Sequence, residues 1–531
     1  MPWCTGLKFF TDISLLLYLA RFCRQVINVY GHMQSHCTMI NLSHTLIAAL
    51  SLLYYIQPIY GYSSSAGKYP PPPRIATNSS STHSIKTYNI PPPSSVDIDS
   101  FRDSKPFRFA KSIPVSISFP VQEELSPPPT FADESHQRWK VKVFSPGALS
   151  LSLIFDTWWI PEDAEVYIYN SQQVIMGAFT ATSSTSSSNS KHAHAFKTSP
   201  LQGDHLVIEY VAPLHVKHFP KIRISRIVYG YKHVPFLESR LPQQDSHDHE
   251  ISTYQRIFSN KKRRQHSGKC NVDLSCDAAG MDWSNEARSV AVLLTDENQM
   301  YCTGVLLNNA LHDGRQLLLT AYHCTKSSNL ATDIVMFNHQ RRTCNGYNKN
   351  KFTSYSDTLH GLKWLAGSPV SDFALLEIQE PIPSKYNVYL AGWSTVETPV
   401  PPFVGIHHPS GDYKKLSIYD GHLIPACWSE CPLKGHWKVE RWTRGTTEPG
   451  SSGSPLFDAS HRVVGQLHGG RSSCRNLRGQ DVYGSFNTSW RNNLGTFLDP
   501  KNQAMTTTGA IQIDGIYLNR IKSKKQRDLS T

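Results

Sequence analysis

The sequence predicts an all-β protein, and three observations support this prediction. Within residues 136–232, short runs such as Leu149–Phe155 alternate apolar and polar side chains, as half-buried strands do. Turn signals such as Pro146–Gly147 separate these runs. Farther along, Leu317–Leu319 and Phe373–Leu376 are short apolar runs that we interpret as strands. Several short strands with regular turns favour a β-sandwich over residues 136–232.

Length and composition exclude several classes of protein. The chain has 531 residues, enough for roughly three or four domains. Its hydrophobic content of 39% excludes a fully disordered chain. Its net charge is +12, but the basic residues are scattered, with dense runs only at 261–264 and 520–526. Since nucleic-acid binders usually gather basic residues on one face, no nucleic-acid partner is expected.

The N-terminal residues 1–67 are expected to be a signal or targeting region. Ile40–Ile59 has a short apolar centre and is followed by small residues, Ser63–Gly67, while Met33 or Met39 is the expected true start. The shortness of the apolar centre favours a cleaved signal peptide, and a retained membrane anchor is the alternative. The protein is therefore expected to be secreted, and to meet a membrane only if this segment stays uncleaved.

Composition shifts divide the next part of the chain. Residues 68–100 are rich in proline and serine and are expected to be a linker. The β-sandwich domain is assigned to 101–235, and a polar connector to 236–264. The connector ends in Lys261–Arg264, which is either a site for polyanions or a processing site.

Three residues predict a catalytic centre farther along the chain. His323 directly follows an apolar strand, Asp372 precedes another, and Ser452 lies in a glycine-serine turn. A serine hydroxyl needs a base to become a nucleophile, histidine is the natural base, and an aspartate holds the correct histidine tautomer. The N–H groups of Gly450 and Ser452 are expected to form the oxyanion hole. Each residue alone is common in structural roles, but their order and flanking strands together indicate catalysis.

The cysteines are concentrated in the same part of the chain. Eight of the eleven lie between Cys270 and Cys474. An even number of cysteines in one stretch is typical of a disulfide-bonded secreted domain.

Two motifs resemble chymotrypsin-like serine proteases. Thr320–Cys324 is close to that family's Thr-Ala-Ala-His-Cys, and Gly450–Pro455 is close to its Gly-Asp-Ser-Gly-Gly-Pro. More closely, residues 265–517 resemble the secreted bacterial lysyl endopeptidases. The shared runs include Ser267–Asn271, Ile406–Pro409, Thr447–Pro455 and Gly465–Gly470.

This resemblance implies a fold, a reaction and a domain order. It implies a chymotrypsin-like double β-barrel catalytic domain over 265–517 that hydrolyses peptide bonds after Lys. Cleavage after Arg is left open. It implies protein or peptide substrates, no cofactor and no metal, and a monomer is expected. Residues 136–232 resemble, more weakly, the propeptide β-domain of such precursors, so the domain assigned to 101–235 is expected to be a propeptide and a partner of the catalytic domain. Residues 518–531 are left as a basic C-terminal tail.

The resemblance also points to a specificity pocket that differs from that of trypsin. Thr446 stands where trypsin carries its specificity acid, whereas lysyl endopeptidases place an Asp downstream, which corresponds to Asp481 here. The matching narrowing pair of the pocket is His468 with Trp428, although ordinary packing is the alternative for the tryptophan. In trypsin-like zymogens an Asp before the nucleophile pairs with the freed N-terminus. That position is Ser451 here, so this mode of activation is not expected.

The cysteine pairing follows partly from the resemblance. It implies the bridges Cys270–Cys474 and Cys276–Cys344, and Cys302–Cys324 would close the loop that leads to His323. Cys427 and Cys431 remain as a small local bridge. The alternative is a zinc site, because His422, Cys427, Cys431 and His436 have ligand-like spacing, but a secreted context favours the disulfide.

The basic run gains a use from the same resemblance. A cut after Arg264 would leave Gln265 as the new N-terminus, with an offset to Cys270 that resembles the mature start in the family. Either a kexin-like enzyme or the protease itself would make this cut. The sequence therefore predicts a secreted serine endopeptidase precursor. The alternatives are a trypsin-like protease of broader basic specificity and a non-catalytic binding protein on the same fold.

Overall fold

The computed structural model of the chain describes the following residues: 85–94, 107–119, 130–133, 136–172, 174–181, 196–232, 267–276, 282–326, 328–341, 344, 357–428, 434–507 and 510–528. The predicted targeting region, most of the predicted linker, the connector and the processing positions Arg264 and Gln265 lie outside these residues. Among the residues described, no helix is long and apolar enough to cross a membrane.

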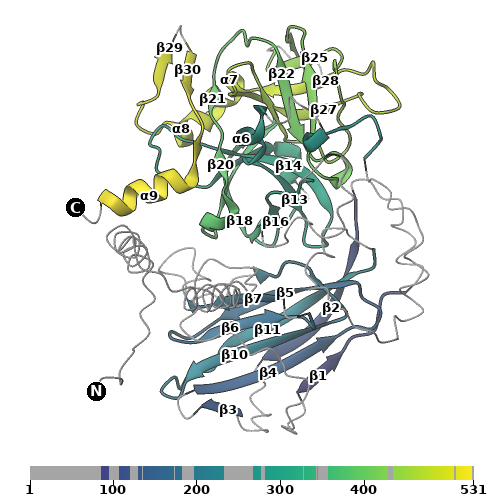
Figure 1. Cartoon of the computed structure of the whole chain (residues 1–531), viewed down its shortest axis with the longest axis vertical. Coiled ribbons are helices and arrows are strands. Elements are labelled where there is room, and N and C mark those ends of the chain that lie inside the picture. The colour runs from purple at the N-terminus through teal and green to yellow at the C-terminus, as the bar shows by residue number, and fades with distance from the viewer. Residues whose placement is uncertain are drawn as a thin grey trace, which may run out of the picture. The chain divides into compact units, whose positions relative to one another are not determined.

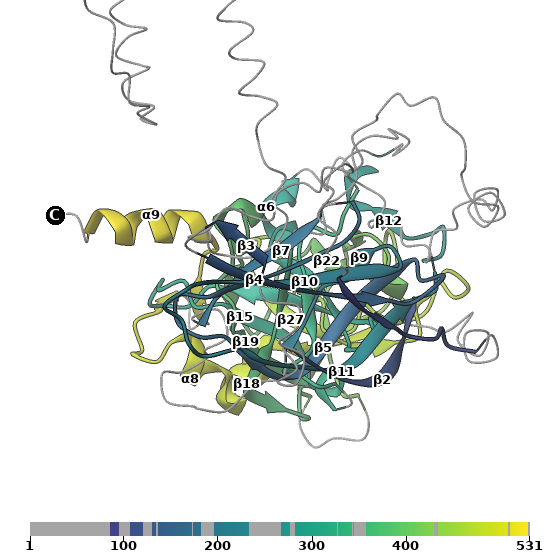
Figure 2. The ribbon, with the colours of Figure 1, turned by 90° about the horizontal axis from the view of Figure 1, so that it is seen from below.

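The first part of the described chain consists of two sheets. One has the order β1-β4-β10-β6-β7, with β3 beside β4: β1 (Lys86–Asn89), β3 (Thr130–Asp133), β4 (His136–Phe144), β6 (Glu165–Tyr169), β7 (Ile175–Phe179) and β10 (His205–Pro213). The other has the order β2-β11-β5-β8, with β9 beside β5: β2 (Ala110–Phe119), β5 (Ser150–Trp159), β8 (Phe196–Lys197), β9 (Leu201–Gln202) and β11 (Lys221–Gly230). Most strands of the two sheets are labelled in Figure 1, and Figure 2 shows the sheets from below.

These two sheets share one apolar core, as the predicted sandwich requires. Val141 and Val143 of β4 and Leu151 and Leu153 of β5 are buried in the same cluster. Alternate residues of a strand point to the same face, so the period-two patterns in the sequence place these side chains inside. One strand lies outside the predicted boundary, since β1 falls within the predicted linker 68–100 and pairs with β4.

The second part of the chain begins with a seven-stranded sheet of antiparallel neighbours. Its order is β17-β16-β13-β14-β15-β19-β18: β13 (Val290–Leu294), β14 (Met300–Leu307), β15 (Leu317–Ala321), β16 (Ile334–Met336), β17 (Thr358–His360), β18 (Leu362–Ser368) and β19 (Phe373–Ile378). The two apolar runs that the sequence analysis interpreted as strands are β15 and β19, and they pair directly.

An eleven-stranded sheet follows. Its main order is β12-β23-β22-β26-β27-β21-β30-β29, and β28, β25 and β24 continue in that order from β27: β12 (Val272–Asp273), β21 (Trp393–Ser394), β22 (Phe403–His407), β23 (Lys415–Tyr419), β24 (Ile424–Ala426), β25 (His436–Val439), β26 (Pro455–Phe457), β27 (Val463–Gly470), β28 (Asp481–Ser485), β29 (Met505–Thr507) and β30 (Ala510–Ile513). A short pair, β20 (Tyr389–Leu390) and β31 (Ile516–Tyr517), stands apart from it.

One apolar core joins the seven-stranded and eleven-stranded sheets. Leu317 and Leu319 of β15 pack in the same cluster as Val404 of β22 and Phe457 of β26. The residue between the two leucines, Leu318, faces the opposite side and belongs to a second cluster. Both faces of β15 are therefore buried, which explains why its residues Leu317–Leu319 are all apolar. The all-β class is confirmed, and the two sheets correspond to the halves of the predicted chymotrypsin-like double β-barrel.

Helices are few and short in the described residues. They are α6 (Ser284–Ala287), α7 (Phe486–Ser489), α8 (Gly495–Leu498), α9 (Leu518–Asp528), the 3-10 turns η3 (Leu274–Cys276), η4 (Tyr322–Thr325), η5 (Ser384–Tyr386) and η6 (Pro409–Gly411), and the π-helical turn η7 (Trp490–Leu494). The predicted basic tail, 518–531, begins with α9 (yellow in Figure 1). This helix buries Leu518 and Ile521 against the core on the far side of β15.

Candidate active site

The pairing of β15 with β19 brings His323 and Asp372 together. His323 lies in η4 directly after β15, Asp372 lies directly before β19, and Ala321 is the register partner of Phe373. His323 Nδ1 lies 2.7 Å from Asp372 Oδ2, and the backbone N–H of His323 donates to Asp372 Oδ1 at 3.0 Å. The carboxylate is 3% exposed and fixes the Nδ1–H tautomer. Nε2 is then the nitrogen that can accept a proton.

Ser452 reaches this pair from the other sheet. It lies in the turn before β26, and its carbonyl accepts the N–H of Thr303 on β14 at 2.8 Å. The sulfur of Cys324 lies 3.9 Å from His323 Nε2 and 4.0 Å from the Ser452 carbonyl oxygen. The three residues predicted as a catalytic triad therefore occupy one neighbourhood where the two sheets meet.

The turn that carries Ser452 depends on two glycines. Gly450 has φ of +102° and Gly453 has φ of +80°, a region that other residues rarely adopt. A Cβ on Gly453 would lie 2.2 Å from Thr320 Oγ1, so only glycine fits there. The Gly450 carbonyl accepts the hydroxyl of Thr303 at 2.8 Å, which holds this peptide from one side.

Asp481 lies at the start of β28 and is completely buried. Its Oδ2 accepts hydrogen bonds from Trp442 Nε1 at 2.7 Å, Thr447 Oγ1 at 2.8 Å and Ser472 Oγ at 2.5 Å. All three donors are neutral, and burial raises the pKa of this carboxyl above its usual value. Within the described part of the chain, no lysine, arginine or histidine forms an ion pair with it. Neutral hydrogen-bond donors therefore hold this buried carboxylate.

A stacked tryptophan and histidine lie beside the catalytic pair. The rings of Trp428 and His468 are parallel within 16°, with centroids 3.8 Å apart. Burial lowers the pKa of His468 to about 4, so this imidazole is neutral near pH 7. Its Nε2 lies 3.6 Å from Asp372 Oδ2, and its Nδ1 lies 3.1 Å from His436 Nε2. His468 therefore connects the stacked tryptophan to the carboxylate that orients His323.

Three disulfides surround these residues. They are Cys270–Cys474, Cys276–Cys344 and Cys302–Cys324, the pairs that the sequence analysis expected. Cys427 is also disulfide-bonded, and its expected partner, Cys431, lies outside the described residues. A disulfide-bonded Cys427 is unavailable to the zinc alternative, and His436 of that alternative contacts His468 instead.

Two groups of described residues have potential metal-ligating atoms within 4.8 Å of one another. One is His323 with Cys302 and Cys324, whose sulfurs are bonded to each other. The other is His323 with Asp372 and His468. In the second group the carboxylate already accepts two hydrogen bonds from His323, so hydrogen bonding alone accounts for its arrangement.

Sequence reasoning missed several residues of this site. One is Trp442, which donates a hydrogen bond to Asp481 and has no local sequence signal. Another is His436, which contacts His468 and whose only sequence signal was its zinc-like spacing. Thr447 and Ser472 lie within or directly after runs shared with the lysyl endopeptidases, and those runs were the signal available for them.

Comparison with known proteins agrees with this geometry. Residues 264–484 match the family model of the lysyl endopeptidase C-terminal domain. A lysyl endopeptidase from Pseudomonas aeruginosa is 31% identical over 224 residues, which cover 39% of this chain and 46% of that protein. The match therefore spans about half the length of that curated relative.

Solved structures with similarity to the chain include bacterial proteases. A serine endoprotease from Yersinia pestis is 14% identical, with a TM-score of 0.29, and the match covers 42% of this chain and 66% of that one. The active form of a protease from M. tuberculosis is 16% identical, with a TM-score of 0.27, and the match covers 42% of this chain and 89% of that one.

Proposed function

Because residues 264–484 are lysyl endopeptidase-like, we propose that the chain is a serine endopeptidase that cuts peptide bonds after lysine. The observation that carries this proposal is the hydrogen-bonded pair of His323 and Asp372 beside the turn of Ser452. A second observation, the completely buried Asp481 with its neutral partners, supports the preference for lysine.

The proposed reaction uses these residues in two steps. His323 Nε2 takes the proton of Ser452 Oγ as that oxygen attacks the carbonyl carbon of the substrate, and the resulting oxyanion accepts the N–H groups of Gly450 and Ser452. The histidine then gives the proton to the leaving amine, and an acyl-enzyme remains. Water attacks this ester with the same histidine as base, which releases the acid and restores Ser452. Asp372 stabilises the imidazolium in both steps.

Lysine preference follows from the chemistry around Asp481. A buried carboxylate without a cation is costly, so a substrate ammonium that reaches it gains more than a neutral side chain does. The stacked pair of Trp428 and His468 would narrow the entrance, which favours a slim ammonium over a planar guanidinium.

The remaining parts of the proposal concern how the enzyme is made. We propose that the β-sandwich belongs to a removable propeptide, that the cut falls after Arg264, and that the protease is a secreted monomer acting on protein or peptide substrates. Disulfides in the catalytic part support an oxidising destination.

The test is labelling and cleavage with the purified chain and a Ser452→Ala variant. A fluorophosphonate should label the wild type at Ser452, and the variant should retain neither labelling nor hydrolysis. Matched peptides with Lys, Arg or Met before the cut then test specificity. Equal turnover of Lys and Arg would support the broader trypsin-like alternative, and no label on the processed wild type would support a non-catalytic protein.

A further inference from the structure

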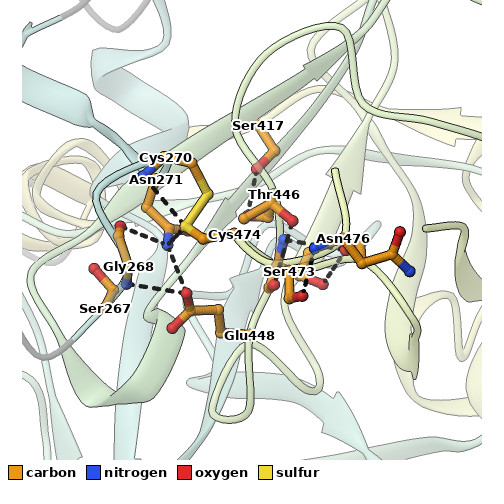
Figure 3. The surroundings of a disulfide bond; sticks show 12 residues. Ser267, Gly268, Cys270, Asn271, Ser417, Thr446, Glu448, Ser473, Cys474 and Asn476 are labelled. Carbon is orange, nitrogen blue, oxygen red and sulfur yellow. Dashed lines mark hydrogen bonds between the residues drawn. A yellow bond between two sulfur atoms is a disulfide. The ribbon is translucent and has the colours of Figure 1, made fainter. Parts of the chain in front are cut away.

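The turn that carries Ser452 is held by a residue that the proposed reaction does not use. Glu448 begins this turn, and its carboxylate contacts two distant segments of the chain. Oε1 accepts the N–H of Gly268 at 2.9 Å and the side-chain amide of Asn271 at 3.1 Å (Figure 3). Oε2 accepts the hydroxyl of Ser410 at 2.8 Å. One carboxylate thus connects three chain segments.

The Ser410 segment also touches the backbone of the turn. The N–H of Ser410 donates to the carbonyl of Pro449 at 2.6 Å. A Cβ built on Gly450 would lie 3.0 Å from the His408 carbonyl and 3.2 Å from the Ser410 nitrogen. The Ser410 segment therefore packs closely against Gly450, whose N–H is proposed to bind the oxyanion.

The Gly268 segment is anchored independently of Glu448. Cys270 is bonded to Cys474, and Ser267 donates its hydroxyl to Asp412 Oδ2 at 2.6 Å. A Cβ on Gly268 would lie 2.3 Å from the Cys474 sulfur and 2.7 Å from Glu448 Oε1, so the glycine allows the close approach. The carboxylate of Glu448 consequently binds a fixed support.

The side chain of Ser451 also stabilises the turn through hydrogen bonds. Its hydroxyl accepts the N–H of Glu448 at 3.2 Å and can therefore donate to His407 Nδ1 at 2.8 Å. Burial lowers the pKa of His407 to about 3, so the ring is neutral, and its Nε2–H donates to Ser417 Oγ at 3.1 Å. This series of hydrogen bonds holds Ser451. Trypsin-like zymogens instead carry at this position an Asp that pairs with the freed N-terminus.

From these contacts we propose that Glu448 is a positioning residue for the oxyanion hole. Its carboxylate fixes the turn of residues 448–452 to the Gly268 and Ser410 segments, so that the N–H groups of Gly450 and Ser452 point to one place before the substrate arrives. This inference rests on the proposed function. It predicts that losing the carboxylate weakens stabilisation of the transition state and leaves binding of the substrate's lysine side chain unchanged.

The test compares Glu448→Ala and Glu448→Gln in the full chain. Removing one oxyanion donor from a protease costs about 10²–10³ in kcat, and we expect misplacement to cost less, roughly ten- to a hundredfold, in Glu448→Ala. KM for a lysyl ester should stay within about twofold, since the mutation spares uniform binding. Glutamine keeps one acceptor oxygen and should recover most of kcat.

Two inhibitors separate positioning from general damage. A lysyl peptide aldehyde forms a hemiacetal with Ser452 and places its oxygen in the oxyanion hole, so its affinity should fall in parallel with kcat. Butylamine occupies only the Asp481 pocket, and its inhibition constant should not change. Glu377→Gln, in β19 of the seven-stranded sheet, is the matched control, because this carboxylate accepts a hydrogen bond from Arg315. This control should keep wild-type kinetics.

The outcomes distinguish this inference from the proposed function. If the wild type fails to hydrolyse lysyl esters, the proposed function is wrong. If the wild type is active and Glu448→Ala has the same kcat and aldehyde affinity, only the role of Glu448 is wrong. A parallel loss of aldehyde and butylamine affinity would also overturn the role, because it would indicate that the whole site had been disturbed.

Discussion

Asp372 and Asp481 are two buried carboxylates, and the difference between their surroundings separates two kinds of task. Asp372 faces two imidazoles, His323 at 2.7 Å and His468 at 3.6 Å. Asp481 faces an indole and two hydroxyl groups, which cannot take up a proton to become cations. Under the proposed function, Asp372 would stabilise a positive charge that forms on His323 during the reaction, and Asp481 would bind a positive charge that the substrate brings.

The largest effect is expected from Asp372→Asn. The amide would favour the wrong tautomer of His323, a change that lowers kcat about 10⁴-fold in a serine protease of the trypsin type. We expect a loss of roughly 10³–10⁴ in kcat for every substrate, with KM little changed, measured by steady-state hydrolysis of Lys and Met peptides.

Asp458→Asn provides the control for this variant. Asp458 is also buried, but its Oδ1 accepts only backbone N–H groups of Ser460 and Arg462, which an asparagine oxygen can replace. It should retain wild-type rates. A loss in Asp372→Asn that is confined to lysyl substrates would contradict the division of tasks between the two carboxylates.

Asp481→Asn should produce a smaller and selective loss. Truncating one partner of a buried charge pair costs about 2–5 kcal/mol, or roughly thirty- to several-thousand-fold in kcat/KM for lysyl substrates. Labelling of Ser452 by a small fluorophosphonate should keep its rate, because that reagent does not use the pocket. Equal losses for Lys and Met peptides would instead assign Asp481 a structural role.

The sequence predicted the partners of Asp372 better than it predicted the partners of Asp481. His323 and Asp372 each adjoin an apolar run, and their residue types and order indicated a triad with Ser452, while the pairing of the two runs as β15 and β19 is seen only in the structure. The donors to Asp481 could not be anticipated in the same way. Trp442 follows β25 and Ser472 follows β27, and both reach Asp481 because those strands pair with β28.

Such cross-strand contacts depend on register, which the sequence leaves open. The contact of His436 also depends on register. The sequence spacing alone had made this residue part of a possible zinc site. The structure pairs it with Gly484 on β28 and brings its ring to His468. The sequence likewise began the sandwich too late, because the four residues of β1 follow a run of prolines and polar residues and carry no clear alternation.

The pH dependence offers a test that changes no residue. Burial raises the pKa of Asp481, so this carboxyl becomes protonated at a higher pH than an ordinary aspartic acid. Once neutral it no longer attracts an ammonium group, and kcat/KM for lysyl peptides should fall as the pH drops through that raised pKa. A change that slows all substrates equally cancels in a ratio of two substrates.

The measurement is the ratio of kcat/KM for a Lys peptide to that for a Met peptide between pH 4 and 8. The ratio should decline toward acid in the wild type and stay flat in Asp481→Asn. A flat wild-type ratio would mean that Asp481 does not bind the substrate's cation.

The smallest effect is expected from Trp428→Ala, which removes the ring stacked on His468 beside Asp372. The tryptophan is 50% exposed and stacks on His468, whose other edge faces Asp372. An aromatic pair contributes about 0.5–1.5 kcal/mol, so its loss should lower kcat/KM for lysyl peptides roughly two- to tenfold. If the stack narrows the entrance as proposed, arginyl peptides should lose less, and the preference for Lys over Arg should shrink. Val400→Ala, at an exposed apolar residue of the catalytic part, is the control and should change neither value. If the preference for Lys over Arg stayed constant in Trp428→Ala, the stacked pair would not discriminate between the two cations.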